Sequence, residues 1–189
     1  MDDKEEVIAQ IAEHYKKIIE LIGENPDREG LVKTPLRAAK ALYYATQGYR
    51  QNPDEIMKSA IFEYAGSQMI IVKDIEFYSF CEHHILPFFG KVSIGYLPNG
   101  NMIGLSKLAR VVNVFARRLQ VQERFTAEIC REVYGTLKAH GVMVVCNAEH
   151  LCMKMRGVEK QDSSTMDYAG RFAEDVALRQ EFLSMLKSI

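Results

Sequence analysis

Residues 142–155 read VMVVCNAEHLCMKM, and this stretch decides how the chain is expected to fold. Its apolar first half predicts a buried strand. Side chains alternate between the two faces of a strand, so a strand over Val142–Met155 would place every second residue on one face. That face would carry Cys146, Ala148, His150, Cys152 and Lys154. The pattern therefore predicts a long strand that brings the imidazole of His150 and the thiol of Cys152 into the same space.

The segments around this stretch predict more strands and several helices. Met69–Ile75 and the alternating Lys91–Leu97 predict two strands. Pro98-Asn99-Gly100 is a turn signal, after which Asn101–Leu105 is expected to return antiparallel. Helices are expected from Ser106 to about Leu119, from Thr126 to about Ala139, and over Val176–Lys187.

The first third of the chain is predicted to be helical. Residues 4–22 carry apolar side chains at helical spacing and end at Gly23, and Thr34-Pro35 is typical of a helix start. A short helix is expected after Asn52. We therefore predict an N-terminal helical region over residues 1–66 and a catalytic domain over residues 67–189. The order of helices and strands indicates an α+β fold with an antiparallel sheet.

Composition limits the classes of protein to which the chain can belong. It has 189 residues, 48% of them hydrophobic, which suits one packed domain with a small extra lobe. A formal net charge of −1 argues against a surface that coats nucleic acid or a membrane. The sequence lacks the roughly 20 consecutive apolar residues of a membrane-spanning helix, and its acidic start does not resemble a secretory signal. We expect a cytoplasmic protein with reduced cysteines and with no nucleic-acid or membrane partner.

Cys81-Glu82-His83-His84 contains the Cys-x-x-His spacing that is common among metal ligands. A third soft ligand at Cys152 turns this weak signal into a strong one, because thiolate with imidazole is the ligand set that zinc selects. Three protein ligands would leave one position for a water molecule, which points to hydrolytic chemistry. The alternative is a closed, structural zinc site in which another histidine supplies a fourth ligand.

His83 and His150 are not needed for the set of three ligands. Either ring could close the site as the fourth ligand. Beside a metal, a spare imidazole also suits proton transfer near neutral pH. The other interpretation is that the two rings support the ligands without moving protons, and the pattern does not decide between these roles.

Two further groups of polar residues suit an anionic, nitrogen-rich ligand. Ser106, Lys107 and Arg110 lie at the start of a predicted helix, where free N–H groups and the helix dipole favour phosphate. The alternative is a solvated basic face. Gln122 and Glu123 follow that helix, and a glutamate there can pair with the N–H edge of a base such as guanine. The alternative for this pair is a charged surface loop.

Four motifs in one order resemble those of the GTP cyclohydrolase I family. They are Cys81-Glu82-His83-His84-x-x-Pro87-Phe88, Gly104-Leu105-Ser106-Lys107-Leu108-Ala109-Arg110, Leu119-Gln120-Val121-Gln122-Glu123-Arg124 and His150-x-Cys152-Met153-x-Met155-Arg156-Gly157. The resemblance implies a tunnelling (T-) fold, which is an antiparallel four-stranded sheet with two helices on one side, plus an N-terminal helical extension. It also implies a toroidal homodecamer of two stacked pentamers, with active sites between subunits.

The same resemblance implies a reaction and a role for each central residue. GTP and water would give 7,8-dihydroneopterin triphosphate and formate, the first step toward folate or tetrahydrobiopterin. Cys81, His84 and Cys152 would bind Zn2+, and its acidified water would attack C8 of guanine. His150 would protonate N7 and assist ring opening, and His83 would handle protons in the later steps.

The resemblance also implies how the substrate is held. Glu123 would bind the guanine edge, with Gln122 beside it. The contacts to the triphosphate and ribose would come from Ser106, Lys107, Arg110 and Arg156. Lys33 or Arg37 of the partner subunit would reach the phosphates.

The chain departs from the family pattern over Met166–Phe172, where Asp167 and Tyr168 replace small hydroxyl residues. This departure bears on strand pairing and subunit contacts and leaves the zinc and imidazole positions intact. A second hypothesis keeps the fold but makes the chain a non-catalytic purine- or pterin-binding protein with a structural zinc. A third is a related enzyme that stops early, at a formamide or cyclic phosphate product.

Overall fold

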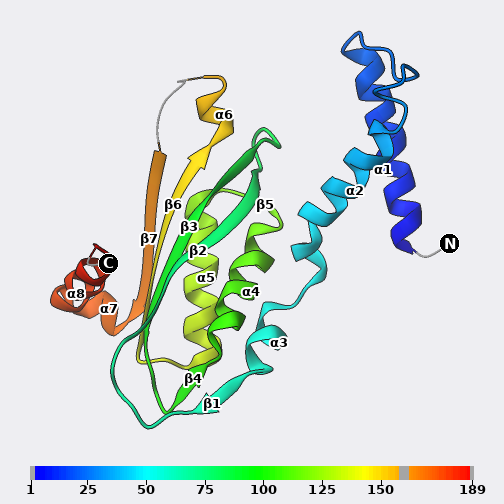
Figure 1. The fold of residues 1–189 in the computed structure, drawn as a ribbon. Helices are drawn as coiled ribbons and strands as arrows, with labels where there is room; N and C mark the ends of the chain where they lie inside the picture. Colours follow the sequence, from blue (N-terminus) through cyan, green and yellow to red (C-terminus); the bar gives the residue numbers. More distant parts are fainter. Residues whose placement is uncertain (1–2, 158–161, 188–189) are drawn as a thin grey trace. The chain divides into compact units, whose positions relative to one another are not determined.

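A computed structural model describes residues 3–157 and 162–187 of the chain (Figure 1). The chain divides into two compact units, Met1–Gln47 and Gly48–Ile189. Among the described residues, no helix is both long enough and apolar enough to cross a membrane.

The first unit is a pair of helices, α1 (Asp3–Leu21) and α2 (Thr34–Ala45), that pack against each other. Both helices match the predicted segments. Gly23 follows α1 with a φ of 87°, a left-handed conformation that costs glycine little and ends the helix. Pro35 lies in the first turn of α2, where its missing N–H leaves no hydrogen bond unmade.

The second unit is an α+β structure built around one sheet. In chain order its elements are η1 (Gln47–Arg50), α3 (Pro53–Lys58), β1 (Ile61–Glu63), β2 (Ile70–Cys81), β3 (Pro87–Leu97), β4 (Asn101–Ile103), α4 (Leu105–Ala116), β5 (Leu119–Gln120), α5 (Gln122–Leu137), β6 (Gly141–His150), α6 (Leu151–Lys154), β7 (Asp162–Gly170), α7 (Arg171–Glu174) and α8 (Val176–Lys187). The sheet order is β5-β2-β3-β6-β7. Four long antiparallel strands confirm the predicted sheet, and β5 adds a two-residue parallel pairing with the end of β2.

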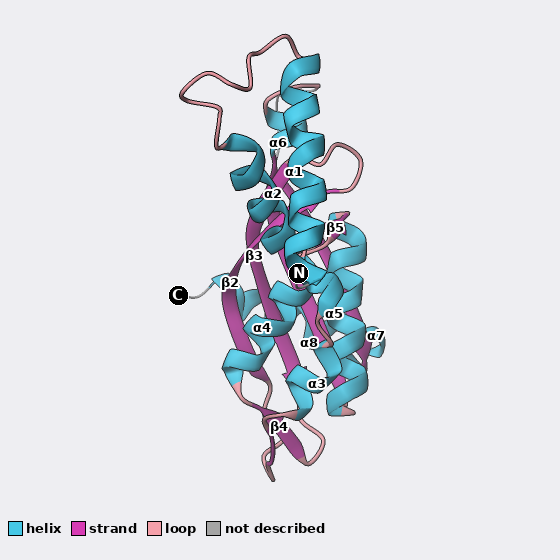
Figure 2. Ribbon diagram, turned by 90° about the vertical axis from the view of Figure 1, so that its right-hand side faces the viewer, coloured by secondary structure: helices cyan, strands magenta, loops and turns pink. Residues whose placement is uncertain are grey.

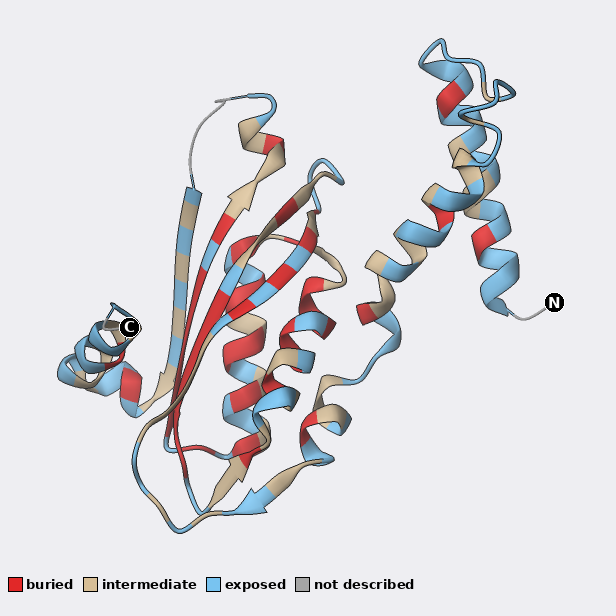
Figure 3. Ribbon diagram, viewed as in Figure 1, coloured by how far each residue is buried: buried red, intermediate tan, exposed pale blue. Residues whose placement is uncertain are grey.

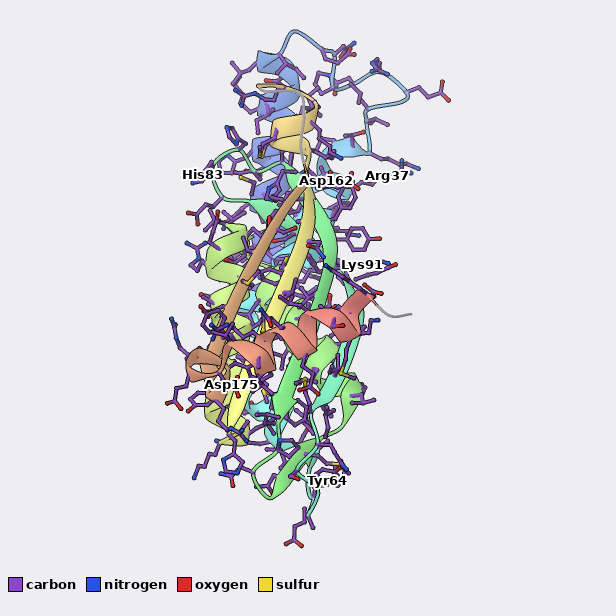
Figure 4. All side chains as sticks on the ribbon, turned by 90° about the vertical axis from the view of Figure 1, so that its left-hand side faces the viewer. Arg37, Tyr64, His83, Lys91, Asp162 and Asp175 are labelled. Carbon is purple, nitrogen blue, oxygen red and sulfur yellow. The ribbon has the colours of Figure 1, made fainter. Side chains whose placement is uncertain are left out.

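The two faces of the sheet are covered by different helices. Val142, Val144 and Cys146 of β6 belong to the core beneath α4 and α5, which lie together on one face (Figure 2). Met143 and Val145 alternate with them and pack in a smaller cluster with Phe172 and Phe182 on the other face, which α8 crosses (Figure 4). Every residue of β6 from Gly141 to Cys146 is buried (Figure 3), because both faces of this strand are covered.

The strand predicted over Val142–Met155 is shorter than expected. β6 ends at His150, and Leu151–Lys154 forms the short helix α6. On one edge of β6, the pairing with β3 ends where Phe88 lies opposite His150. On the other edge, the pairing with β7 ends where Asp162 lies opposite Glu149. Within residues 3–157 and 162–187, no neighbouring strand continues the ladder beyond these pairs, and the backbone satisfies its hydrogen bonds in a helical turn. Cys152 therefore lies on a helix, not on the strand face that the alternation predicted.

Asn101–Leu105 was also expected to return along Lys91–Leu97, and this expectation is wrong. β4 pairs with β1, in the register Ile61 opposite Ile103. The reason lies in β3, which already has β2 on one edge and β6 on the other. A third partner has no free edge to join, so the chain after the turn at Gly100 pairs elsewhere.

Two predicted helix starts shift by a few residues. α4 begins at Leu105 with Gly104 before it, so Ser106 lies in the first turn and its side chain caps nothing. α5 begins at Gln122, and the Thr126 hydroxyl donates to the Gln122 carbonyl inside the helix (2.8 Å). β7 was missed as a strand, although the family pattern pointed to one there.

Gly90 on β3 allows a close approach that no other residue would permit. A Cβ built there would lie 1.9 Å from the Asn147 carbonyl oxygen of β6. We expect Gly90→Ala to force β3 and β6 apart and to destabilise folding by about 2–4 kcal/mol. Gly135→Ala is the matched control, because a Cβ on this exposed glycine of α5 meets nothing within 4 Å. It should stabilise the helix by about 0.5–1 kcal/mol. Urea unfolding of both variants measures the difference, and an unchanged midpoint for Gly90→Ala would contradict the packing argument.

Candidate metal centre and active site

The loop between β2 and β3 holds Cys81 and the two adjacent histidines in a tight turn. The Cys81 N–H donates to the Leu86 carbonyl (2.9 Å), and the Ile85 N–H donates back to the Cys81 carbonyl (2.8 Å). Ile85 adopts a φ of 53°, which reverses the chain sharply for a residue with a branched side chain. The turn lies at the end of the sheet where β7 begins, and His83 projects from it (Figure 4).

Cys81, His84 and Cys152 form a cluster whose ligand atoms all lie within 4.8 Å of one another. The Cys81 Sγ is 3.9 Å from the His84 Nδ1. In a tetrahedral zinc site the sulfur and nitrogen ligands are about 3.5–3.8 Å apart, given bonds of about 2.3 and 2.0 Å. The three side chains therefore fit a zinc ion after small adjustments. The structure brings together the three residues that the sequence predicted as ligands, with Cys152 delivered by α6.

The protonation of Cys152 depends on its burial and on its neighbours in the cluster. Burial first, and then the adjacent Cys81 thiol, raise the pKa of Cys152, while the positive charge of Arg156 opposes this rise. Without a metal, the thiol of Cys152 is thus favoured in its protonated form. Because zinc binds thiolates, metal binding must displace these protons, and affinity for the metal falls as pH is lowered.

A hydrogen-bond network anchors the loop that carries the ligands. The Arg124 guanidinium donates to the carboxylate of Glu82, to the Leu119 carbonyl (3.0 Å) and to the side-chain oxygen of Gln120 (3.1 Å). The Glu82 N–H in turn donates to the Gln120 carbonyl (2.9 Å). The hydrogen bond from Arg124 lowers the pKa of Glu82, so the carboxylate stays ionised. Sequence patterns gave no sign of this network, because its members are joined only through the pairing of β5 with β2.

We expect Arg124→Lys to weaken zinc binding by about tenfold, because lysine keeps the charge but loses the forked geometry that reaches three acceptors. Competition with a colour-changing chelator measures the affinity. Arg131→Lys, an exposed change on the same helix, is the control and should leave affinity unaltered. Equal zinc affinity in both variants would show that the network does not position the ligands.

His150 lies at the end of β6, beside the cluster, in a well-defined environment. Its ring stacks on the buried ring of Phe88, with centroids 4.7 Å apart and planes at 3°. Its Nε2 is 2.8 Å from the side-chain oxygen of Gln122, the first residue of α5. Burial lowers the pKa of His150, and the nearby carboxylate of Glu123 partly opposes this. The ring is thus favoured in its neutral form.

His83 is exposed, unlike His150, and is held less firmly. Its Nδ1 lies 3.9 Å from the Cys81 Sγ, and its Nε2 lies 3.9 Å from a carboxylate oxygen of Glu82. The His83 and His84 rings are nearly perpendicular, at 86°. His83 can therefore reach the space beside the metal cluster without belonging to it.

The predicted substrate contacts fall into two groups within one chain. Glu123 and Arg156 are exposed at the same end of the sheet as the cluster, as their effects on His150 and Cys152 indicate. Ser106, Lys107 and Arg110 are not there, because they lie in the first turns of α4, near β4 (Figure 1). The other end of this 12-residue helix leads to β5, which pairs with Cys81. The helix is about 18 Å long, so a single chain does not bring its first turn to the cluster.

Lys33 and Arg37 belong to the first unit, at the start of α2.

Ser163 of β7 is a site residue that sequence reasoning missed. Its hydroxyl donates to the side-chain oxygen of Gln122, the same atom that faces His150. The only available signal was its place in a Ser-Ser-Thr run, which by itself predicts no partner.

Comparison with known proteins decides the family. A sequence model of a family described as GTP cyclohydrolase I matches residues 11–187. The chain belongs to the GTP cyclohydrolase I family. Proteins named GTP cyclohydrolase 1 from Porphyromonas gingivalis and Bacteroides fragilis are 54% and 51% identical to it, over 97% and 99% of this chain and 96% and 99% of theirs. The protein of that name from Drosophila melanogaster is 48% identical over 98% of this chain and 58% of its own length.

Among solved structures, the apo form of the archaeosine synthase QueF-Like overlaps 57% of this chain and 97% of its own. The TM-score is 0.43 and the identity is 14%. The family assignment depends on the sequence relatives, which are named as enzymes. The chain is therefore an enzyme of the GTP cyclohydrolase I type.

Proposed function

We propose that this protein converts GTP and water to 7,8-dihydroneopterin triphosphate and formate, with Zn2+ as its metal. The observation that carries the proposal is the convergence of Cys81, His84 and Cys152, with His83 in contact with Cys81 and His150 two positions before Cys152. Two thiols and one imidazole leave one corner of a tetrahedral site for water, which is the arrangement of catalytic zinc. When bound, zinc supplies the Lewis acidity that makes a water molecule nucleophilic near neutral pH.

The side chains around the cluster supply the proton transfers that ring opening needs. We propose that His150 gives a proton to N7 of guanine, since stacking on Phe88 fixes its ring and the lowered pKa of His150 makes the protonated ring a readier proton donor. We propose that His83, which is exposed, handles protons in the later steps, in which formate leaves and the ribose rearranges. We propose that the exposed carboxylate of Glu123 accepts hydrogen bonds from the N–H edge of guanine.

The triphosphate would be bound by Ser106, Lys107, Arg110 and Arg156. The first three lie at the start of α4, far from the cluster of their own chain, so we propose that neighbouring subunits share each active site. β7 supports such an assembly, because it is an edge strand of nine residues with exposed Met166 and Tyr168. We propose that subunits with a T-fold join along their sheets into a toroidal decamer of two pentamers, and that Lys33 or Arg37 of the partner subunit reaches the phosphates.

The wider setting follows from this reaction. The product leads to folate or another pterin, and all four cysteines are free thiols, as expected in the reducing cytoplasm. We propose that residues 1–66 serve assembly and that residues 67–189 carry the catalytic groups.

Incubation of zinc-loaded protein with GTP tests the proposal. We expect release of one formate per GTP, together with a pterin that becomes fluorescent after oxidation. Binding of GTP or a pterin without formate would support instead the non-catalytic binding protein with a structural zinc. A product that keeps its formyl group or carries a cyclic phosphate would indicate an enzyme that stops early.

A further inference from the structure

The side-chain amide of Gln122 has all of its hydrogen-bonding capacity in use. The side chain is 3% exposed. Its Nε2 donates to the carbonyls of Cys146 (3.0 Å) and Ser163 (3.2 Å). Its Oε1 accepts from the Ser163 hydroxyl and faces the His150 Nε2 at 2.8 Å. An amide offers two donors and two acceptor positions, so none is left for another ligand.

These partners decide which way the amide points. Backbone carbonyl oxygens only accept hydrogen bonds, so the side of Gln122 that faces Cys146 and Ser163 must be the NH2 group. Rotating the amide by half a turn would bring its oxygen against two carbonyl oxygens and bury both without a donor, which is costly. The oxygen therefore faces His150. Since this oxygen can only accept, the His150 Nε2 must carry the hydrogen.

The second ring nitrogen of His150 is in a different situation. Stacking on Phe88, which lies opposite His150 in the sheet register, fixes the plane of the ring. Within residues 3–157 and 162–187, the contact with Gln122 is the ring's one hydrogen bond, and Nδ1 makes none. The two nitrogens thus differ, because Nε2 is committed to the protein and Nδ1 is available to a ligand.

We propose that Gln122, supported by Ser163, is a positioning residue that holds His150 with its proton on Nε2, so that Nδ1 exchanges protons with the substrate. This inference rests on the proposed function as far as the substrate is concerned. Nδ1 first takes up a proton from solvent, which makes the ring an imidazolium. In the transfer to guanine, the Nδ1–H bond then breaks and the N7–H bond forms, and the ring returns to its neutral form with the Nε2 hydrogen still bonded to Gln122. Gln122 then acts through His150 and makes no side-chain contact with the guanine edge, which leaves that role to Glu123.

The first test is spectroscopic and needs no turnover. Nitrogen NMR of zinc-loaded, full-length protein labelled with 15N-histidine distinguishes a protonated ring nitrogen from a bare one. Comparison with the His150→Gln variant assigns the His150 signals. We expect a neutral ring with hydrogen on Nε2 and a bare Nδ1. A spectrum with the hydrogen on Nδ1 would overturn the proposal.

The second test separates positioning from substrate contact by steady-state kinetics. Gln122→Met keeps the volume of the side chain and removes the acceptor, so kcat should fall by about tenfold or more while KM for GTP stays within about threefold. A raised KM with unchanged kcat in Gln122→Met would show instead that the amide contacts the substrate.

Ser163→Ala provides a milder change if Gln122→Met does not fold. It removes one donor to the Gln122 oxygen and leaves both carbonyl partners, so the Nε2 hydrogen of His150 should persist and kcat should fall by only about threefold. A mixture of the two ring tautomers in this variant would show that the hydrogen bonds from Gln122 to the Cys146 and Ser163 carbonyls do not fix the orientation of the amide. If the unaltered protein releases no formate from GTP, the proposed function fails, whereas the NMR result still decides the hydrogen position on His150.

Discussion

Replacing Cys152 with serine is expected to remove bound zinc and to reduce formate release from GTP by at least about a thousandfold. The change replaces one sulfur atom with oxygen, so the packing of α6 is nearly preserved. A serine hydroxyl stays protonated at neutral pH and is a poor ligand for zinc, whereas a cysteine can bind as thiolate. Among the residues that the structure describes, three side chains form the cluster, so losing one leaves too few to retain the ion. Metal analysis of the purified variant and a formate assay measure the two effects.

Cys130→Ser is the matched control for this prediction. Cys130 is also a buried cysteine, and its Sγ lies 3.9 Å from the Val142 carbonyl within the core. Burial raises its pKa to about 12, so the thiol stays protonated and cannot serve as a metal ligand. This variant should keep its zinc, about one ion per chain, and its activity. Full zinc content and turnover in Cys152→Ser would remove the basis of the proposed function, and loss of both in Cys130→Ser would point to general damage to the fold.

The sequence predicted which three side chains come together better than it predicted the elements that carry them. Cys81 and His84 are close in sequence, so one tight turn brings them together and the spacing alone is informative. Cys152 was expected to share a strand face with His150, but it reaches the cluster on α6. The end of β6 is set by where β3 and β7 stop pairing, and alternation within one segment contains no information about its neighbours.

The same limit explains the misplaced β4 and the dispersed substrate residues. Whether Asn101–Ile103 can pair with β3 depends on whether β3 has a free edge, which only the order of the whole sheet decides. The family motifs assigned Ser106 and Lys107 to the same site as the cluster. In one chain they lie in the first turn of α4, whereas the last turn of this helix is the one that leads to the cluster through β5. Periodicity predicts which face of a helix is buried, whereas the distance between its ends and a site depends on tertiary structure. The hydrogen bonds of Gln122 likewise join β6, β7 and α5, three elements that no local pattern connects.

Replacing His150 with glutamine is expected to lower kcat by about a hundredfold to a thousandfold while zinc stays bound. His150 is not among the three clustered ligands, so metal retention follows from the geometry. General acid–base catalysis by a positioned side chain typically contributes 10²–10⁴-fold, and a glutamine in its place cannot cycle a proton. A thousandfold loss equals about 4 kcal/mol of transition-state stabilisation. The lost stacking on Phe88 should cost only about 1 kcal/mol, so the variant should fold.

His140→Gln is the matched control, because it makes the same chemical change at an exposed histidine beside the start of β6, at the other end of that strand. It should leave zinc content, kcat and KM unchanged. A separate measurement of GTP binding to His150→Gln distinguishes lost chemistry from lost affinity, and we expect binding to change by less than about threefold. Loss of zinc in His150→Gln would make His150 a fourth ligand and the site a closed, structural one. Retained zinc with retained turnover would instead leave the metal centre intact and require that another group deliver the proton to guanine.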